Sequence, residues 1–167
     1  MKMPKERSAG VVVLRWSEMG WQFLALETGM RWEDGSPRMD FPKGHLDGDE
    51  DWLEAAIRET EEESGIEEKD LAFTWGLRYH DCVRPGKVCR MFIASTSATP
   101  RIRPNPVSKK REHQGSRWLV LEDETSEQRL HPYLRSGILW ARTIVTKSAL
   151  DSGHEKMLRP VRGGKSS

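Results

Sequence analysis

Residues 41–66 decide the fold, and they read FPKGHLDGDEDWLEAAIRETEEESGI. The second half of this stretch is rich in residues that favour a helix, and the pattern predicts one over residues 49–64. Asp51 and Glu54 stand three residues apart, as in a capping box at a helix start. Gly65 then supplies the left-handed residue that commonly ends a helix.

The faces of this helix differ in chemistry. At about 100° per residue, one arc carries small or apolar side chains and is expected to pack on a sheet: Leu53, Ala56, Ile57, Thr60 and Ser64. Glu59, Glu62 and Glu63 share a neighbouring arc, off the core-facing side. A solvated face is the commoner reason for such glutamates, and a hard cation held by their carboxylates is the alternative.

Acidic residues are concentrated in this part of the chain. Residues 47–70 contain twelve acidic and two basic side chains, a local charge of −10, whereas the whole chain carries only +1. The remainder therefore carries +11, a separation that suits a divalent cation bridging the protein to a polyanionic substrate. The small net charge argues against a general nucleic-acid coat protein.

The rest of the chain alternates short strands with loops and ends in a second helix. Strands are expected over residues 9–15, 21–27, 40–45, 72–79, 88–97 and 116–121. Residues 28–38 are rich in Gly, Asp, Ser and Pro and predict a loop. A helix over residues 132–148 carries an apolar stripe typical of core packing, formed by Leu134, Ile138, Ala141 and Val145. This succession predicts an α/β fold with helices packed on a mixed β-sheet.

Size and composition suit one domain. We expect it to span residues 1–150 of the 167, followed by a disordered tail over residues 151–167. Cys82 and Cys89 lack zinc-site spacing and are interpreted as free thiols in a reducing compartment. The sequence shows neither a signal peptide nor an apolar run of the ~20 residues that span a bilayer. We therefore expect a cytoplasmic protein without membrane contact, and leave its oligomeric state open.

The whole segment resembles the Nudix box. The matching residues are Gly44, then Glu50 after five residues, then residues 58–66, RETEEESGI, after seven more. Thr60 stands where that family usually has an aliphatic residue, a departure at a packing position. The resemblance implies an α/β/α sandwich and a Mg²⁺-dependent hydrolase, with Mn²⁺ as a substitute. Such an enzyme cleaves pyrophosphate linkages in nucleoside-diphosphate-containing substrates.

The resemblance also implies roles for single residues. The metal-binding groups would be the side chains of Glu59, Glu62 and Glu63 and the carbonyl of Gly44. Arg58 would orient a carboxylate, and Glu50 would brace the loop against the helix. Magnesium neutralises phosphate charge and activates a water, whose proton a carboxylate can accept. The base stays open between Glu59, Glu112 and water held by the metals.

Motifs outside the box are similar to the asymmetric diadenosine tetraphosphate hydrolase branch, whose products are ATP and AMP. They are Ser8-Ala-Gly-Val, Phe41-Pro-Lys-Gly-His, Glu112-His-Gln with Arg117-Trp-Leu, and His131-Pro-Tyr-Leu. By this likeness Lys43 and His45 would contact phosphate, and Glu112 would add a carboxylate to the metal site. An ordinary turn at Lys43 and His45, and a solvated Glu112, are the alternatives.

One position departs from that branch. Two residues after Glu-His-Gln the branch commonly has an aromatic side chain that stacks on a nucleobase, and this chain has Ser116. Stacking is worth about 1–3 kcal/mol per base, so base recognition is expected to be weaker or to lie elsewhere. Tyr79, Trp75 and Trp32 are the candidate substitutes, and Tyr79 is the one expected to contact substrate.

Other functions remain open. Residues 101–117 carry six basic side chains and one acidic, which suits a phosphate backbone and an RNA 5′ pyrophosphohydrolase or decapping-type enzyme. The same segment could hold a diphosphoinositol polyphosphate, or be a solvated loop. A non-catalytic nucleotide-sensing or RNA-binding Nudix module is the last alternative, although the box carboxylates that such modules typically lose are all present.

Overall fold

The computed structural model describes residues 5–104 and 112–151. The elements follow one another as β1 (Glu6–Ser17), β2 (Gly20–Arg31), β3 (Pro37–Asp40), β4 (Lys43–His45), α1 (Trp52–Ser64), η1 (Glu68–Asp70), β5 (Tyr79–Arg84), β6 (Lys87–Ser95), β7 (Gly115–Val120), η2 (Glu127–Arg129), η3 (Pro132–Leu134) and α2 (Arg135–Asp151). The tail predicted after Asp151 lies outside the described residues. Within the described part, no helix is both long and apolar enough to cross a membrane.

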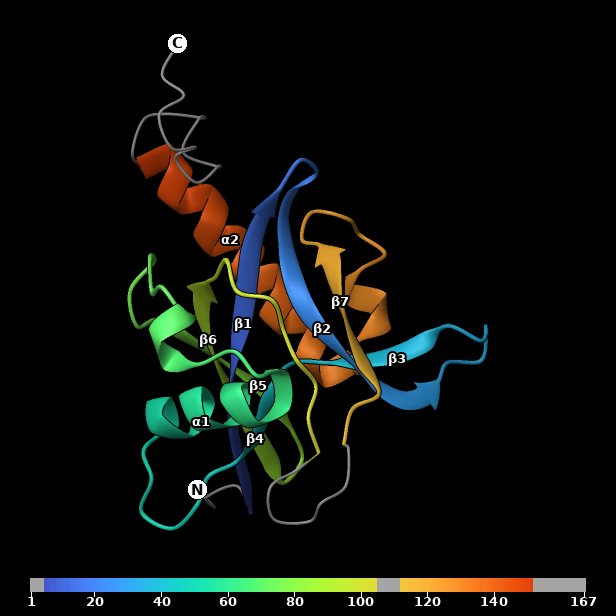
Figure 1. Ribbon diagram of the computed structural model, residues 1–167, viewed down its shortest axis with the longest axis vertical. Coiled ribbons are helices and arrows are strands. Elements are labelled where there is room, and N and C mark those ends of the chain that lie inside the picture. The colour runs from blue at the N-terminus through green and yellow to red at the C-terminus, as the bar shows by residue number, and fades with distance from the viewer. Residues whose placement is uncertain (1–4, 105–111, 152–167) are drawn as a thin grey trace.

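The sheet is mixed, as predicted, and β1 lies at its centre (Figure 1). β1 pairs in parallel with β6 along most of its length, and β6 forms an antiparallel hairpin with β5. On its other side β1 pairs antiparallel first with β4 and then with β2. β2 in turn pairs with both β3 and β7. The short strand β4 therefore lies beside β1 where β2 has not yet begun to pair.

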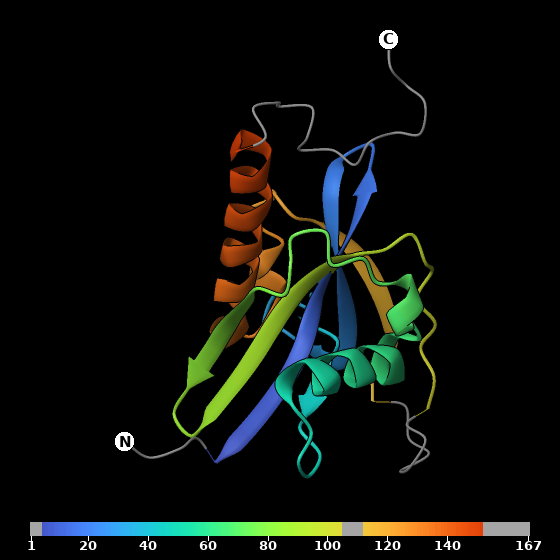
Figure 2. The same cartoon turned by 90° about the vertical axis from the view of Figure 1, so that its left-hand side faces the viewer.

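β1 is buried on both faces, as its β-branched run predicts. Val12 and Leu14 belong to one apolar cluster, which includes the side chains of α2. Val11 and Val13 belong to the other, which includes Ala55 and its neighbours in α1. The two helices accordingly lie on opposite faces of the sheet (Figure 2). The α/β/α sandwich is confirmed.

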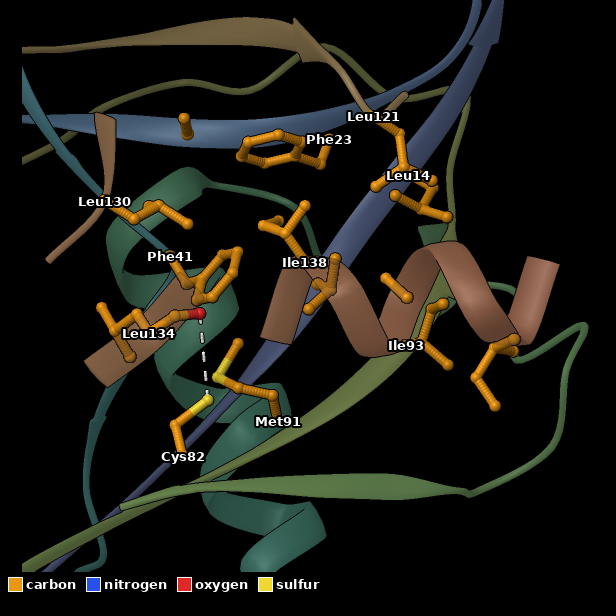
Figure 3. Close-up of a cluster of buried hydrophobic side chains, with 14 of the residues drawn as sticks. Leu14, Phe23, Phe41, Cys82, Met91, Ile93, Leu121, Leu130, Leu134 and Ile138 are labelled. Carbon is orange, nitrogen blue, oxygen red and sulfur yellow. Dashed lines mark hydrogen bonds between the residues drawn. The ribbon is translucent and has the colours of Figure 1, made fainter. Parts of the chain in front are cut away.

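The apolar stripe predicted over residues 132–148 packs as expected, although its first turn is the 3₁₀ helix η3 and α2 begins at Arg135. Leu134, Ile138, Ala141 and Val145 are 0–3% exposed. Figure 3 shows Ile138 and Leu134 in one apolar cluster with Phe23 of β2 and Phe41. Cys82 also lies in this cluster, and both cysteines are free and buried.

Three expectations about the strands are wrong. Residues 28–38 are not one loop, because β2 continues through a bulge to Arg31 and β3 begins at Pro37. The strand expected over residues 40–45 is two strands with different partners. The strand expected over residues 72–79 is reduced to one bridge between Ala72 and Ser95. The backbone of this segment forms no further strand, but its side chains still pack: the ring centroid of Trp75 lies 5.3 Å from that of Trp21.

Candidate active site

The ends of α1 are fixed as the sequence predicts. The Asp51 side chain accepts a hydrogen bond of 2.8 Å from the Glu54 N–H at the first turn. At the other end Gly65 is left-handed, with φ 76°, and its N–H donates to the Glu61 carbonyl at 2.8 Å. Both caps satisfy backbone groups that a helix otherwise leaves without partners.

The orientation of α1 differs from the prediction. Ala56, Thr60 and Ser64 are buried as predicted, together with Ala55, whereas Leu53 and Ile57 are only partly buried and border a hollow of about 500 Å³. The buried arc is therefore turned toward Ala55, and Glu59 and Glu63 lie within it rather than beside it. The side chain of Glu59 is only 13% exposed.

Gly44 makes this orientation possible. A Cβ at Gly44 would overlap the carboxylate of Glu59, so the absence of a side chain leaves room for a glutamate between α1 and β4. Glu63 is fixed at the same strand, because its Oε1 accepts a hydrogen bond of 2.9 Å from the Lys43 N–H. The prediction that Glu63 lies off the core-facing arc is wrong for this reason.

A cavity of about 440 Å³ opens between α1, β4 and the segment before β7. It is lined by eight of the predicted site residues, which are Lys43, Gly44, His45, Arg58, Glu59, Glu62, Glu63 and Glu112. These residues come from three separate segments of the chain. The fold thus gathers the acidic helix face, the turn after Phe41 and the Glu112 loop at one place.

Arg58 links the carboxylates of the cavity. Its guanidinium donates to Glu50 at 2.8 and 2.9 Å, to Glu59 at 2.8 Å and to Glu62 at 3.1 Å. Nη2 also donates to the His45 carbonyl at 2.9 Å. Glu50 additionally accepts from the Asp47 N–H at 3.0 Å, so one arginine ties the loop to the helix. The planar guanidinium fork suits such a set of acceptors.

The carboxylates facing β4 are held in an unfavourable setting. Burial raises the pKa of Glu63 to about 9, and the nearby carboxylates of Asp40 and Glu59 add to the shift. Burial likewise raises the pKa of Glu59, and the negative charges of Glu62 and Glu112 add to this shift, although Arg58 opposes it. Since desolvation and like charges both disfavour ionised carboxylates, a cation bound among them would remove part of this cost.

The cavity lining also includes basic groups. Lys43 Nζ lies 3.2 Å from Asp40 Oδ2. Burial disfavours the charged form of Lys43, yet the Asp40 carboxylate raises its pKa above the ordinary value. The imidazole of His45 is 67% exposed at the cavity rim, with Nε2 3.9 Å from Glu6 Oε2.

Comparison with known proteins assigns this arrangement. The NUDIX domain family matches residues 4–141. The chain belongs to the Nudix family. It is 36% identical over 106 residues to the asymmetrical bis(5′-nucleosyl)-tetraphosphatase of Mus musculus, an alignment covering 61% of this chain and 66% of the mouse protein. Its identity to the Caenorhabditis elegans protein of the same name is 30% over 120 residues, covering 70% and 80% of the two chains.

A solved structure shows the same likeness. The crystal structure of a C. elegans Ap4A hydrolase binary complex aligns with a TM-score of 0.61 and 25% identity. The alignment covers 89% of this chain and 98% of that one. The fold that carries the Nudix box in this chain is therefore similar to that of the C. elegans hydrolase.

The metal-binding role of the Nudix carboxylates can be weighed against their geometry. Among the residues that the structure describes, no three acidic, histidine or cysteine side chains converge closely enough to hold an ion as they stand. Glu59 and Glu62 each direct an oxygen to the Arg58 guanidinium, at 2.8 and 3.1 Å. The donor set is nevertheless made of hard oxygens, and burial raises the pKa of Glu63, so that a bound cation would favour its ionised form. The residues fit a hard divalent cation.

None of the three aromatic candidates to replace the side chain missing at Ser116 lines the Nudix cavity. Tyr79 is not among the lining residues. Its ring centroid instead lies 3.8 Å from the Arg90 guanidinium and 6.0 Å from the ring of Phe92. Trp75 packs in the core. Trp32 donates to the Arg129 carbonyl at 3.0 Å and has Arg38 over its ring at 4.2 Å.

Three cavity residues were missed by the sequence reasoning as site candidates, namely Ser8, Asp47 and Lys87. Lys87 begins β6 after the turn at Gly86, and the parallel register places it opposite Glu6. Its Nζ and the Arg84 guanidinium lie 5.8 and 4.7 Å from the ring of Tyr133. No local sequence pattern identifies Lys87 as a site residue, because its position at the cavity depends on the pairing of β1 with β6.

Proposed function

We propose that this chain is a Mg²⁺-dependent hydrolase of dinucleoside polyphosphates such as diadenosine tetraphosphate, which it cleaves asymmetrically to ATP and AMP. The observation that carries the proposal is one cavity lined both by Glu59, Glu62, Glu63 and Glu112 and by Lys43 and Lys87. The carboxylates suit a cation, and the amines suit the phosphates that the cation bridges. Relatives named asymmetrical bis(5′-nucleosyl)-tetraphosphatases support the substrate class.

The proposed chemistry assigns a task to each group. Glu59, Glu62, Glu63 and the Gly44 carbonyl would hold Mg²⁺, with Glu112 adding a further carboxylate. Bound Mg²⁺ supplies charge neutralisation at the phosphates and acidifies water for in-line attack. Glu59 and Glu112 are the candidate proton acceptors, and the raised pKa of Glu59 favours it as a base near neutral pH.

Arg58 would keep Glu59 and Glu62 in fixed rotamers rather than touch substrate. Lys43 and His45 would bind phosphate from β4, and Lys87 would bind it from β6. Beside Lys87, the Arg84 guanidinium lies over the ring of Tyr133 and adds a further positive charge. A substrate with several phosphates would contact the cation held by the helix carboxylates and these basic groups.

The RNA alternative finds less support in the described residues. Of the basic segment, Arg103 donates to the Glu61 carbonyl at 3.4 Å, and Arg117 pairs with Glu27 at 2.7 Å. Both side chains therefore bind groups of the protein itself and do not form a continuous basic surface for an RNA backbone. Three further basic residues of this segment, at positions 109–111, lie outside the described residues. We also propose a cytoplasmic location, in keeping with the two free thiols.

The test of the substrate class is product analysis. Purified protein with Mg²⁺ is incubated with diadenosine tetraphosphate, with 5′-triphosphorylated RNA and with a diphosphoinositol polyphosphate. ATP plus AMP from the dinucleotide, with the other two substrates cleaved at least about tenfold more slowly, is expected. Faster release of phosphate or pyrophosphate from RNA would replace the proposal by the RNA alternative. Binding of nucleotide without turnover of any substrate would favour the non-catalytic one.

The test of the metal groups uses matched charge changes on one helix. Glu62→Gln and Glu63→Gln are expected to lower kcat by roughly 10²-fold or more while the circular dichroism spectrum stays unchanged. Glu61→Gln is the control, because Glu61 has the same charge and helix but lies outside the cavity lining. A folded Glu62→Gln/Glu63→Gln double variant with undiminished Mg²⁺-dependent activity would contradict the metal assignment.

A further inference from the structure

Asp40, the last residue of β3, contacts two side chains from different parts of the chain. Its Oδ1 accepts a hydrogen bond of 2.9 Å from the Phe41 N–H, which fixes the carboxylate. Its Oδ2 lies 3.2 Å from Lys43 Nζ and 3.6 Å from Nε2 of His113. One oxygen therefore faces both an ammonium and an imidazole.

The topology explains how these residues meet. β2 has β3 on one side and β7 on the other, so that Leu26 pairs with both Asp40 and Ser116. His113 precedes β7 by two residues and reaches Asp40 across β2, while Lys43 begins β4. Asp40 thus joins β4 to the segment before β7, two parts of the site that the sheet does not connect by direct pairing.

The contacts are largely withdrawn from water. The side chains of Asp40, Lys43 and His113 are 19, 14 and 8% exposed. Burial would raise the pKa of Asp40, but His113 and Lys43 outweigh it and hold the pKa below the ordinary value. A buried charge that loses its partner is costly and seeks another, so the identity of the group at position 40 matters to both neighbours.

Each partner of Asp40 is attached to a cavity residue. Lys43 lines the cavity itself, and its N–H holds Glu63. His113 follows Glu112, which also lines the cavity. Asp40 does not line it, so any influence on substrate must pass through these neighbours.

We propose that Asp40 is a positioning residue, which holds the Lys43 ammonium on the phosphate side of the cavity and, through His113, fixes the segment that presents Glu112. This inference rests on the proposed function. Without the Asp40 charge, the Lys43 ammonium would turn to the carboxylate of Glu63, which already acts on it. Phosphate binding would lose a cation, and the metal site would lose free carboxylate oxygens.

The test is calorimetric and needs no turnover. Binding of Mn²⁺, and of inorganic tripolyphosphate in the presence of Mn²⁺, is measured for the wild type and for Asp40→Asn, in which the amide oxygen can still accept from Phe41. Both affinities are expected to fall by about tenfold, the lower end of what loss of an outer-shell partner costs. The control is Asp81→Asn, which breaks the 2.8 Å ion pair with Arg90 outside the cavity and should leave both affinities within about twofold.

A double-mutant cycle identifies the route. If Asp40 acts through Lys43, Asp40→Asn should change tripolyphosphate affinity less than about twofold in a Lys43→Met background. Equal losses in both backgrounds would overturn the proposal. So would a lowered Tm of Asp40→Asn with unchanged affinities, because Asp40 would then only support the fold.

Two further arms keep the result decisive. If Asp40→Asn does not fold, Lys43→Met and His113→Asn are combined, because both side chains contact Asp40. Non-additive losses support the proposal, and additive losses contradict it. Absence of diadenosine tetraphosphate hydrolysis by the wild type would overturn the proposed substrate, whereas these binding measurements would still report on Asp40.

Discussion

At the scale of single residues, Arg58 is the group on which the site geometry depends most directly. Its fork contacts Glu50, Glu59 and Glu62 at once. Arg58→Lys keeps the charge but loses the planar fork, so we expect kcat to fall by roughly tenfold or more, with a smaller change in KM. Steady-state kinetics with diadenosine tetraphosphate would measure both constants.

The matched control for this change is Arg142→Lys. Arg142 also bridges several groups, the Glu127 carboxylate at 2.8 Å and the Asp123 carbonyl at 2.9 Å, but in the α2 layer. It should lower stability without changing kcat. An Arg58→Lys enzyme as active as Arg142→Lys would show that the carboxylates keep their positions without the fork.

Gly44 sets the distance between β4 and α1. In Gly44→Ala the new methyl group would overlap the Glu59 carboxylate, so Glu59 must move and we expect Mn²⁺ affinity to fall by at least about tenfold. Gly115→Ala serves as the comparison, because its methyl group would meet Glu27 only at an ordinary 3.8 Å. Calorimetric titration with Mn²⁺ distinguishes them, and equal affinities in the two variants would refute the steric argument.

At the scale of elements, the C-terminus of α1 allows a clean stability experiment. Gly65 has φ 76°, and a Cβ there would lie 2.7 Å from the Arg101 carbonyl oxygen, whereas Gly76 has φ 85° with open space around it. Gly76→Ala should cost about 1–2 kcal/mol, the left-handed penalty alone. Gly65→Ala should cost more, because contact with the Arg101 backbone is added. Urea unfolding measures both, and equal losses would mean that the Arg101 segment yields without cost.

The elements also show what the sequence could and could not predict. The ends of α1 were predictable because capping depends on residues within one turn, Asp51 with Glu54 and Gly65 with Glu61. The rotation of α1 was not, because it depends on the space that Gly44 leaves in a strand from another part of the sheet. β5 was missed since its pairing comes from the hairpin with β6 rather than from an apolar pattern of its own.

The same division holds for the site. The spacing of Glu59, Glu62 and Glu63 on a helix is local and could be predicted. The contact between Asp40 and His113 could not, because it forms only when β3 and β7 lie on either side of β2. Tyr79 was expected near substrate on its chemistry alone, and the register of β5 places it beside Arg90 instead.

At the scale of the whole molecule, the sandwich places two apolar layers on either side of one sheet and an acidic site at the edge of one layer. We propose that the elements from β1 to α2 fold as one unit, because β1 contributes to both layers. The site then opposes this unit's stability, since Glu63 and Glu59 are buried beside each other. Stability and cation binding are therefore linked through the same carboxylates.

This linkage makes a prediction for thermal unfolding. A ligand at about 100 times its Kd stabilises the folded state by about 2.7 kcal/mol, which for a chain of this size raises Tm by roughly 5–11 °C. We expect Mg²⁺ to produce such a rise over EDTA at equal ionic strength. In Glu63→Gln the rise should largely disappear, because a proposed ligand is lost.

Without metal, the Glu63→Gln substitution is not expected to lower Tm. The pKa of Glu63 is raised to about 9 in the folded protein, so its ionisation favours unfolding as pH rises above the ordinary carboxylate range. Glutamine cannot ionise and still accepts from the Lys43 N–H. At pH 8 metal-free Glu63→Gln should therefore melt no lower than the metal-free wild type. A variant that melts lower without metal, yet gains as much from Mg²⁺ as the wild type, would show that Glu63 supports the fold and not the cation.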